Sequence, residues 1–286
     1  MEDGSANEGE STRGICMEHL LRNDPKLTHT TEARQARTNL PGALKKAAGI
    51  LGSCLADCLY PPRCPLCERI LLPGEGLACD RCRRELSFIL HPRCFICGKP
   101  VSDPRQELCG DCARHPHLYE RGRAAFLYEK QVRRSVDRLK FYNRREYIPF
   151  YGACLYRILC EEIYDWRPEC LIPVPMHPKK KAERGFDQAA LLAEELGRRS
   201  NVPVREDILY RKRYTGASKK LGRASRRKNL RGVFAVHDRA VLPGRVVLID
   251  DIYTTGATVD EAALALRTAG VEHIFFLTVC IGRGDA

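Results

Sequence analysis

Apolar residues in the C-terminal part of the chain alternate between short runs and helical spacings. The runs favour strands at 124–128, 170–175, 202–209, 233–236, 246–249 and 273–281, and helical spacing recurs at 132–139, 151–159, 189–199 and 259–266. Strands that alternate with helices predict an α/β fold, with a mostly parallel sheet flanked by helices.

One segment of this pattern carries chemistry. Val246 to Ile249 read as a strand buried on both faces, and Asp250 and Asp251 follow at its carboxyl end, where open α/β sheets bind ligands. The small residues that come next open a helix, whose free N–H groups suit a phosphate; they are Thr254, Thr255, Gly256, Ala257 and Thr258. The alternative is an ordinary buried strand, turn and helix. The paired acids favour a site, since neither common glycine-rich phosphate motif is present.

Cysteines give a second signal. Four Cys-x-x-Cys pairs recur every 15 residues, at Cys64, Cys67, Cys79, Cys82, Cys94, Cys97, Cys109 and Cys112. Two such pairs complete a tetrahedral zinc site, so about two structural zinc ions are expected. Sequential pairing is favoured, while interleaved pairing stays open, as do free thiols or a redox dithiol. A complete set of four thiolates leaves no open coordination position, which predicts a folded module and no reaction centre.

Composition indicates the kind of binding partner and the cellular compartment. The net charge of +12 favours anionic partners such as phosphates, pyrophosphate or nucleic acid. No apolar run is long enough for a membrane span, and the acidic N-terminus does not resemble a secretory signal. Fifteen cysteines then indicate reduced thiols and metal ligands in the cytoplasm.

Three regions follow from these patterns. Residues 1–42 contain few apolar residues and predict a disordered extension. Residues 43–115 combine a short helix, ended by Pro61-Pro62, with the cysteine module. Residues 120–284 form the α/β domain.

The segment 246–258 resembles the phosphoribosyl-pyrophosphate (PRPP) motif of type I phosphoribosyltransferases. Together with 59–64, 172–177, 184–188 and 213–234, it makes residues 50–284 resemble the ComF family. That family joins an N-terminal zinc region to a phosphoribosyltransferase-like domain and is linked to DNA uptake in competent bacteria. The chain departs from the family pattern at Asp187, where Asn is usual, and at Ser218 and Ser225.

The resemblance implies roles for the residues already singled out. Asp250 and Asp251 would hold the ribose hydroxyls, 254–258 the 5′-phosphate, and the backbone at Pro175 and Met176 the pyrophosphate, with Mg²⁺ bound alongside PRPP. Residues 211–231, which hold ten Lys or Arg and no acid, would form a hood over the substrate. The alternatives for this basic segment are contact with single-stranded DNA and a solvated loop.

Three functions remain open at this point. The first is a PRPP-dependent transferase, and the second is a non-catalytic accessory protein of DNA uptake that binds PRPP or single-stranded DNA. The third is a zinc-dependent adaptor to other DNA-uptake proteins, in which the transferase fold is vestigial.

Overall fold

The computed structural model describes residues 60–215 and 223–283. It divides into two compact units, one reaching to Leu86 and the other running from Ser87 to Ala286. The division falls inside the expected module 43–115, so the second half of the cysteine repeat belongs to the larger unit. The predicted extension 1–42 and most of the predicted helix that follows it lie outside the described residues.

The smaller unit is a zinc-knuckle turn followed by a short helix. The knuckle closes where the Cys64 amide donates to the Arg69 carbonyl over 2.8 Å and the Glu68 amide donates to the Cys64 carbonyl over 2.8 Å. The helix α3 (Asp80–Glu85) begins directly after Cys79, so its first turn presents the second cysteine pair.

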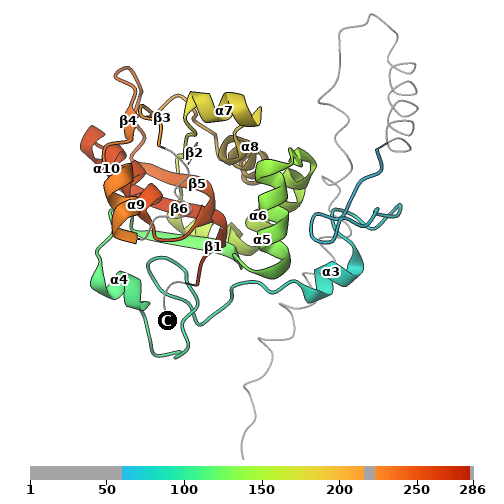
Figure 1. Cartoon of the computed structure of the whole chain (residues 1–286). Coiled ribbons are helices and arrows are strands. Elements are labelled where there is room, and N and C mark those ends of the chain that lie inside the picture. Colours follow the sequence, from blue (N-terminus) through green and yellow to red (C-terminus); the bar gives the residue numbers. More distant parts are fainter. Residues whose placement is uncertain (1–59, 216–222, 284–286) are drawn as a thin grey trace, which may run out of the picture. The chain divides into compact units, whose positions relative to one another are not determined.

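The larger unit is built on a parallel sheet of four strands in the order β1-β6-β5-β2 (Figure 1). Their bounds are β1 (Arg121–Leu127), β2 (Cys170–Pro173), β5 (Arg245–Tyr253) and β6 (His273–Ile281). Every pairing between them is parallel, which confirms the predicted fold class. The side chains from Val246 to Ile249 are fully buried, as expected for a strand covered on both faces.

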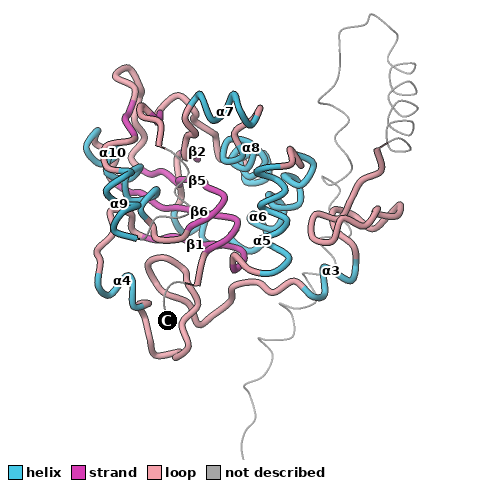
Figure 2. Tube along the Cα trace, in the orientation of Figure 1, coloured by secondary structure: helices cyan, strands magenta, loops and turns pink. Residues whose placement is uncertain are grey.

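Helices cover both faces of this sheet. Figures 1 and 2 show α5 (Lys130–Phe141), α6 (Ile148–Trp166) and α8 (Gln188–Ser200) on one side, and α9 (Arg223–Leu230) and α10 (Ala257–Ala269) on the other. Two short helices, α4 (Gly110–Arg114) and α7 (Pro178–Arg184), and the 3₁₀ turn Arg145–Tyr147 complete the helical part. Strands β3 (Leu209–Arg211) and β4 (Phe234–Val236) pair as a separate antiparallel ribbon.

The predicted strand at 202–209 is wrong in most of its length. Only Val204 forms a bridge, to Leu171 in β2, and regular pairing begins at Leu209. The Leu171 amide donates to the Pro203 carbonyl and the Arg205 amide donates to the Leu171 carbonyl, each over 2.8–2.9 Å. Because Pro203 has no N–H to donate, the ladder does not extend through it.

Candidate functional site

The eight cysteines gather into two groups of four, each made of two successive pairs. One group is Cys64, Cys67, Cys79 and Cys82, the other is Cys94, Cys97, Cys109 and Cys112, and within each the sulfur atoms lie within 4.8 Å of one another. The Cys67 and Cys79 sulfurs are 3.7 Å apart and those of Cys97 and Cys109 are 3.6 Å apart. A tetrahedral zinc with Zn–S bonds of about 2.3 Å needs sulfur separations of about 3.8 Å, so both groups fit structural zinc.

The second cysteine group is part of the core of the larger unit. Cys94, Cys97 and Cys109 are buried in the same apolar cluster as residues of β5, β6 and α10. The Gly122 amide in β1 donates to the Ile96 carbonyl, inside the knuckle, over 2.6 Å. This half of the repeat is therefore folded onto the edge strand of the sheet.

The two acids of the motif lie near the end of β5. This strand runs on to Tyr253, but its pairing with β2 stops at Pro173 opposite Ile249, so Asp250 and Asp251 project past the end of that neighbour. Asp251 is buried, and the Asp250 carboxylate accepts a 2.8 Å hydrogen bond from the Asp251 amide. Desolvation and the adjacent Asp251 charge raise the pKa of Asp250 to about 8, although its side chain keeps some solvent access.

Four cations from three other elements surround this acidic pair. Lys140, in the last turn of α5, places Nζ 2.9 Å from Asp251 Oδ2. Lys180 and Arg184 of α7 interact electrostatically with Asp251, and Arg211 of β3 interacts with Asp250. Burial lowers the pKa of Lys180, and the neighbouring Arg184 cation adds to that shift. A partly buried group of cations beside carboxylates suits a polyanion that carries hydroxyls or a metal.

The turn after β5 leads directly into α10. Gly256 is the N-cap, with φ +79°, and no side chain caps the helix. A Cβ atom at Gly256 would lie 2.5 Å from the Tyr253 hydroxyl and 3.2 Å from Cε1 of His117, so the turn requires glycine on both counts. The first N–H groups of a helix have no carbonyl partner within it, which makes this turn able to receive an anion.

The backbone at Pro175 and Met176 lies beyond the end of β2 and is held by Asp187. One carboxylate oxygen of Asp187 accepts from the Met176 amide over 3.0 Å, and the other caps α8 by accepting from the Ala189 amide over 3.0 Å. An asparagine has one acceptor oxygen and could not serve both amides in this way. Asp187, which stands where the resembled pattern usually has Asn, therefore holds the loop at Met176 against the start of α8.

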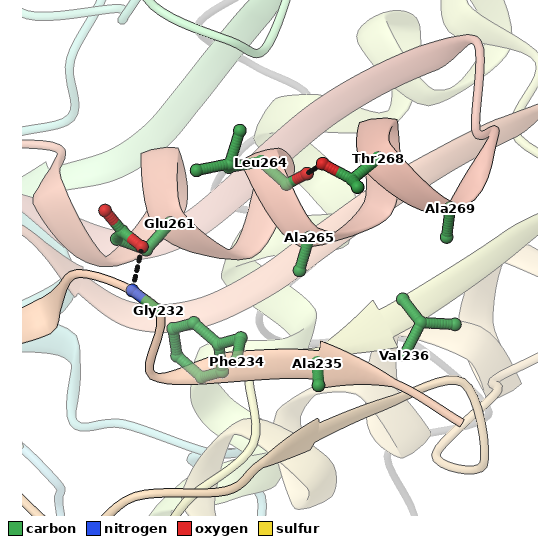
Figure 3. Close-up of a pocket in the computed structure, with 9 residues that line it drawn as sticks. All are labelled: Gly232, Phe234, Ala235, Val236, Glu261, Leu264, Ala265, Thr268 and Ala269. Atoms are coloured by element: carbon green, nitrogen blue, oxygen red, sulfur yellow. Dashed lines mark hydrogen bonds between the residues drawn. The ribbon is translucent and has the colours of Figure 1, made fainter. Parts of the chain in front are cut away.

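The basic segment 211–231 runs from the end of β3 to the end of α9, and its residues 216–222 lie outside the described part of the chain. Arg213 donates to the carbonyls of Asn229 over 3.1 Å and Arg231 over 2.8 Å, which ties the two ends of the segment together. The Gly232 amide then donates to Glu261 of α10 over 2.8 Å (Figure 3). The two ends of the segment are therefore tied together, and the residue that follows it is fixed to α10.

A pocket of about 350 Å³ lies elsewhere, between α10 and β4. Figure 3 shows Phe234, Ala235 and Val236 on one side and Leu264 and Ala265 on the other. Neither motif acid lines this pocket, so it is separate from the cluster of acids and cations.

Comparison with known proteins agrees with the cysteine geometry. The model of the double zinc ribbon domain matches residues 55–113. Competence protein ComFC of Bacillus subtilis is 31% identical over 206 residues, which cover 70% of this chain and 82% of that protein. The chain belongs to the ComF family. Competence protein F of Haemophilus influenzae is 29% identical, over 74% of this chain and 93% of its own length, and DNA utilization protein YhgH of Escherichia coli K12 is 27% identical over 77% and 97%.

Three contributors to this ComF site were missed in the sequence, and one of them is Lys180 of α7. Lys140 is 111 positions before Asp251, and the helical pattern around it indicates only packing, so nothing in the local sequence links the two residues. His117 follows the last cysteine pair and is part of no recognisable motif.

In the part of the chain that the structure describes, no helix is long and apolar enough to cross a membrane.

Proposed function

We propose that this ComF-family chain binds PRPP with Mg²⁺ and transfers or exchanges its phosphoribosyl group, in a role connected with DNA uptake. The domain from 120 to 284 would carry this site. The link to DNA uptake rests on the relatives named competence protein F and ComFC.

One observation carries the proposal. The Asp250–Asp251 pair lies at the end of β5, beside the uncapped start of α10 and within a group of four cations from α5, α7 and β3. PRPP presents the matching chemistry, since it has two ribose hydroxyls, a 5′-phosphate and a pyrophosphate.

Different residues would bind different groups of PRPP. Asp250 and Asp251 accept hydrogen bonds from the ribose hydroxyls, and the amides of 254–258 bind the 5′-phosphate. Arg184 and Lys180 face the pyrophosphate and stabilise its negative charge as it departs. The carboxylates lie where they can stabilise the positive charge that develops on the ribose ring. Mg²⁺ that arrives with PRPP would be held by Asp250 and substrate oxygens, and would neutralise part of the pyrophosphate charge.

Pyrophosphate departure requires that water be kept from the ribose. We assign this role to the basic segment 211–231, and the hydrogen bonds of Arg213 and Gly232, which hold its described ends near α10, support the assignment. A closed basic hood would also complement the charge of the leaving group.

Isothermal calorimetry tests the binding step. The wild-type chain should bind PRPP only when Mg²⁺ is present, and the double variant Asp250→Asn, Asp251→Asn should weaken binding by about 100-fold or more, because two hydrogen bonds to charged groups are lost. The matched control is Asp238→Asn, which removes an exposed carboxylate after β4. Equal PRPP affinity in the wild type and the double variant would exclude the proposal.

A second candidate function is favoured by exposed cations near the same edge of the sheet. Lys179 and Lys181 of α7 and Lys212, Arg213 and Lys228 of the basic segment are exposed. Exposed cations of this kind contact nucleic-acid phosphates. A PRPP- or single-stranded-DNA-binding accessory protein without turnover would use them, and the name DNA utilization protein YhgH is consistent with this.

A mobility-shift assay with single-stranded DNA over a salt series tests this candidate. The variant Lys179→Ala, Lys212→Ala should reduce the slope of log affinity against log salt by about 1.4, since each single-strand phosphate contact contributes about 0.7. The control is Arg105→Ala, Arg198→Ala, which removes the same charge at two other exposed sites. Arg105 lies between Cys97 and Cys109, and Arg198 lies in the last turn of α8. No shift at low salt, or equal slopes for both variants, would reject direct DNA binding.

A further inference from the structure

A short connection joins the second cysteine group to the start of the sheet and passes the anion-binding turn. It runs from α4, which contains Cys112, to β1 at Arg121. Within it, the His117 side chain is 3% exposed, and its Nδ1 lies 2.9 Å from one Asp260 carboxylate oxygen and 3.1 Å from the other. Asp260 is in the first turn of α10. Because a carboxylate only accepts, Nδ1 of His117 donates this bond.

The same histidine also packs against the turn itself. Its Cε1 lies 3.2 Å from where a Cβ at Gly256 would be, which is possible only because residue 256 is glycine. The His117 ring stacks on Tyr119, with ring centroids 4.8 Å apart. The Tyr119 hydroxyl in turn lies 2.7 Å from that of Tyr253, the last residue of β5. His117 and Tyr119 thus contact both ends of the segment 253–260.

The cysteine group reaches the turn by another route as well. Lys99, two residues after Cys97, is buried and pairs with Asp111 over 2.6 Å. Asp111 immediately precedes Cys112 in the chain. The Lys99 ammonium lies 5.9 Å from the centre of the Tyr253 ring. Because separating a buried ion pair is costly, the Lys99–Asp111 pair holds this part of the cysteine group beside the Tyr253 ring.

We propose that zinc at the second cysteine group holds the anion-binding turn 254–258 in shape, with His117 as the positioning residue that links the two. The assignment of this turn to the 5′-phosphate rests on the proposed function. Zinc fixes Cys109 and Cys112, and through them α4 and the connection to β1. Without the metal the connection loses its anchor, and Gly256 and Asp260 lose the packing and the hydrogen bond that His117 supplies.

Hydrogen exchange of the segment 252–262, measured together with zinc content, tests this link. Cys109→Ser should lower zinc from about two to about one per chain and speed exchange in the segment by tenfold or more. Cys67→Ser is the matched control, since it also removes one ligand but lies in the other compact unit. It should lose one zinc and leave exchange within twofold of wild type. Equal exchange in the two variants would overturn the proposal.

A second pair of variants keeps both cysteine groups intact. His117→Phe retains a ring but has no donor, while His117→Asn places an amide N–H close to the position of Nδ1. Both should bind about two zinc ions per chain. His117→Phe should speed exchange at 252–262 and weaken binding of inorganic phosphate, each by about tenfold, as expected for a lost hydrogen bond to a charged group. His117→Asn should restore most of both.

Identical behaviour of the two His117 variants would contradict a positioning role. The zinc and exchange measurements need no PRPP, so they stay informative in every case. A wild-type chain that fails to bind PRPP would therefore count against the proposed function alone, and the exchange data would still decide the link between zinc and the turn.

Discussion

Asp250 and Asp251 have different surroundings. The Lys140 ammonium lies 2.9 Å from the Asp251 carboxylate, whereas desolvation and the Asp251 charge raise the pKa of Asp250 to about 8. With a pKa raised to about 8, Asp250 would carry a proton near neutral pH in the ligand-free site. A ligand that needs both carboxylates charged must displace that proton when it binds.

This proton would make the proposed PRPP binding depend on pH. The folded-state pKa of Asp250 is raised, so affinity should increase as the pH rises from 7 through about 8, by up to about tenfold per pH unit, and level off above it. Calorimetry at pH 7, 8 and 9 measures this. In Asp250→Asn the same series should be flat, and a flat series in the wild type would show that Asp250 is already charged.

Stability of the ligand-free chain should change in the opposite sense. Asp250 ionises near 3.8 when unfolded and near 8 when folded, so the folded state binds more protons between these values. The stabilising contribution is present at low pH and is lost as the pH rises towards 8. The pH dependence of stability and that of the proposed PRPP affinity therefore both come from the proton on Asp250.

The turn between β5 and α10 is the element on which the site depends. Its geometry follows from Gly256, whose φ of +79° and close neighbours exclude a side chain. Gly270 ends the same helix at φ +110°, with nothing within 4 Å of a Cβ placed there. Both glycines have a positive φ, but only Gly256 has close neighbours. Comparing substitutions at the two positions therefore separates the effect of backbone strain from the effect of crowding.

Replacing each glycine by alanine exploits this difference. Both variants should lose about 1–2 kcal/mol of unfolding free energy, since each puts a side chain in the left-handed region. Gly256→Ala should lose more and also weaken PRPP binding, because its Cβ displaces Tyr253 or His117. Urea unfolding and calorimetry measure the two effects. Unchanged PRPP affinity in Gly256→Ala would remove this turn from the binding site.

Elements with a strong period were predictable from the sequence, and those set by distant contacts were not. The strand predicted at 273–281 matches β6, and the helix predicted at 189–199 matches α8 to within one residue at each end. The run 246–249 predicted a strand, but β5 continues to Tyr253 because β6 pairs with it that far. The helix α7 was missed, since PKKKAER has no apolar stripe.

The site was predictable in part for the same reason. The acids and the turn after them are contiguous, so a local pattern reveals them. Lys140 and His117 reach the site only through the fold, from positions 111 and 143 residues away from their partners. The cysteine spacing predicted two metal sites but could not show that the second belongs to the core of the larger unit.

The whole chain joins two metal-stabilised ribbons to a sheet with one chemically distinctive edge. Only the second ribbon lies in the same compact unit as that edge. Positive charge is also concentrated at that edge, because α7 and the basic segment supply exposed lysines and arginines. These residues lie around Asp250, which is partly buried, and Asp251, which is buried. The proposed function therefore rests on one spatial claim, which is that PRPP binds at the end of β5 and the start of α10.

An NMR titration of the ¹⁵N-labelled chain with PRPP and Mg²⁺ tests that claim most directly. The amides of Thr255, Gly256, Ala257 and Thr258 should shift together with the Asp250 and Asp251 amides and saturate at one PRPP per chain. Saturating shifts confined to the pocket between α10 and β4, or to exposed lysines of the basic segment, with the 255–258 amides unmoved, would contradict it.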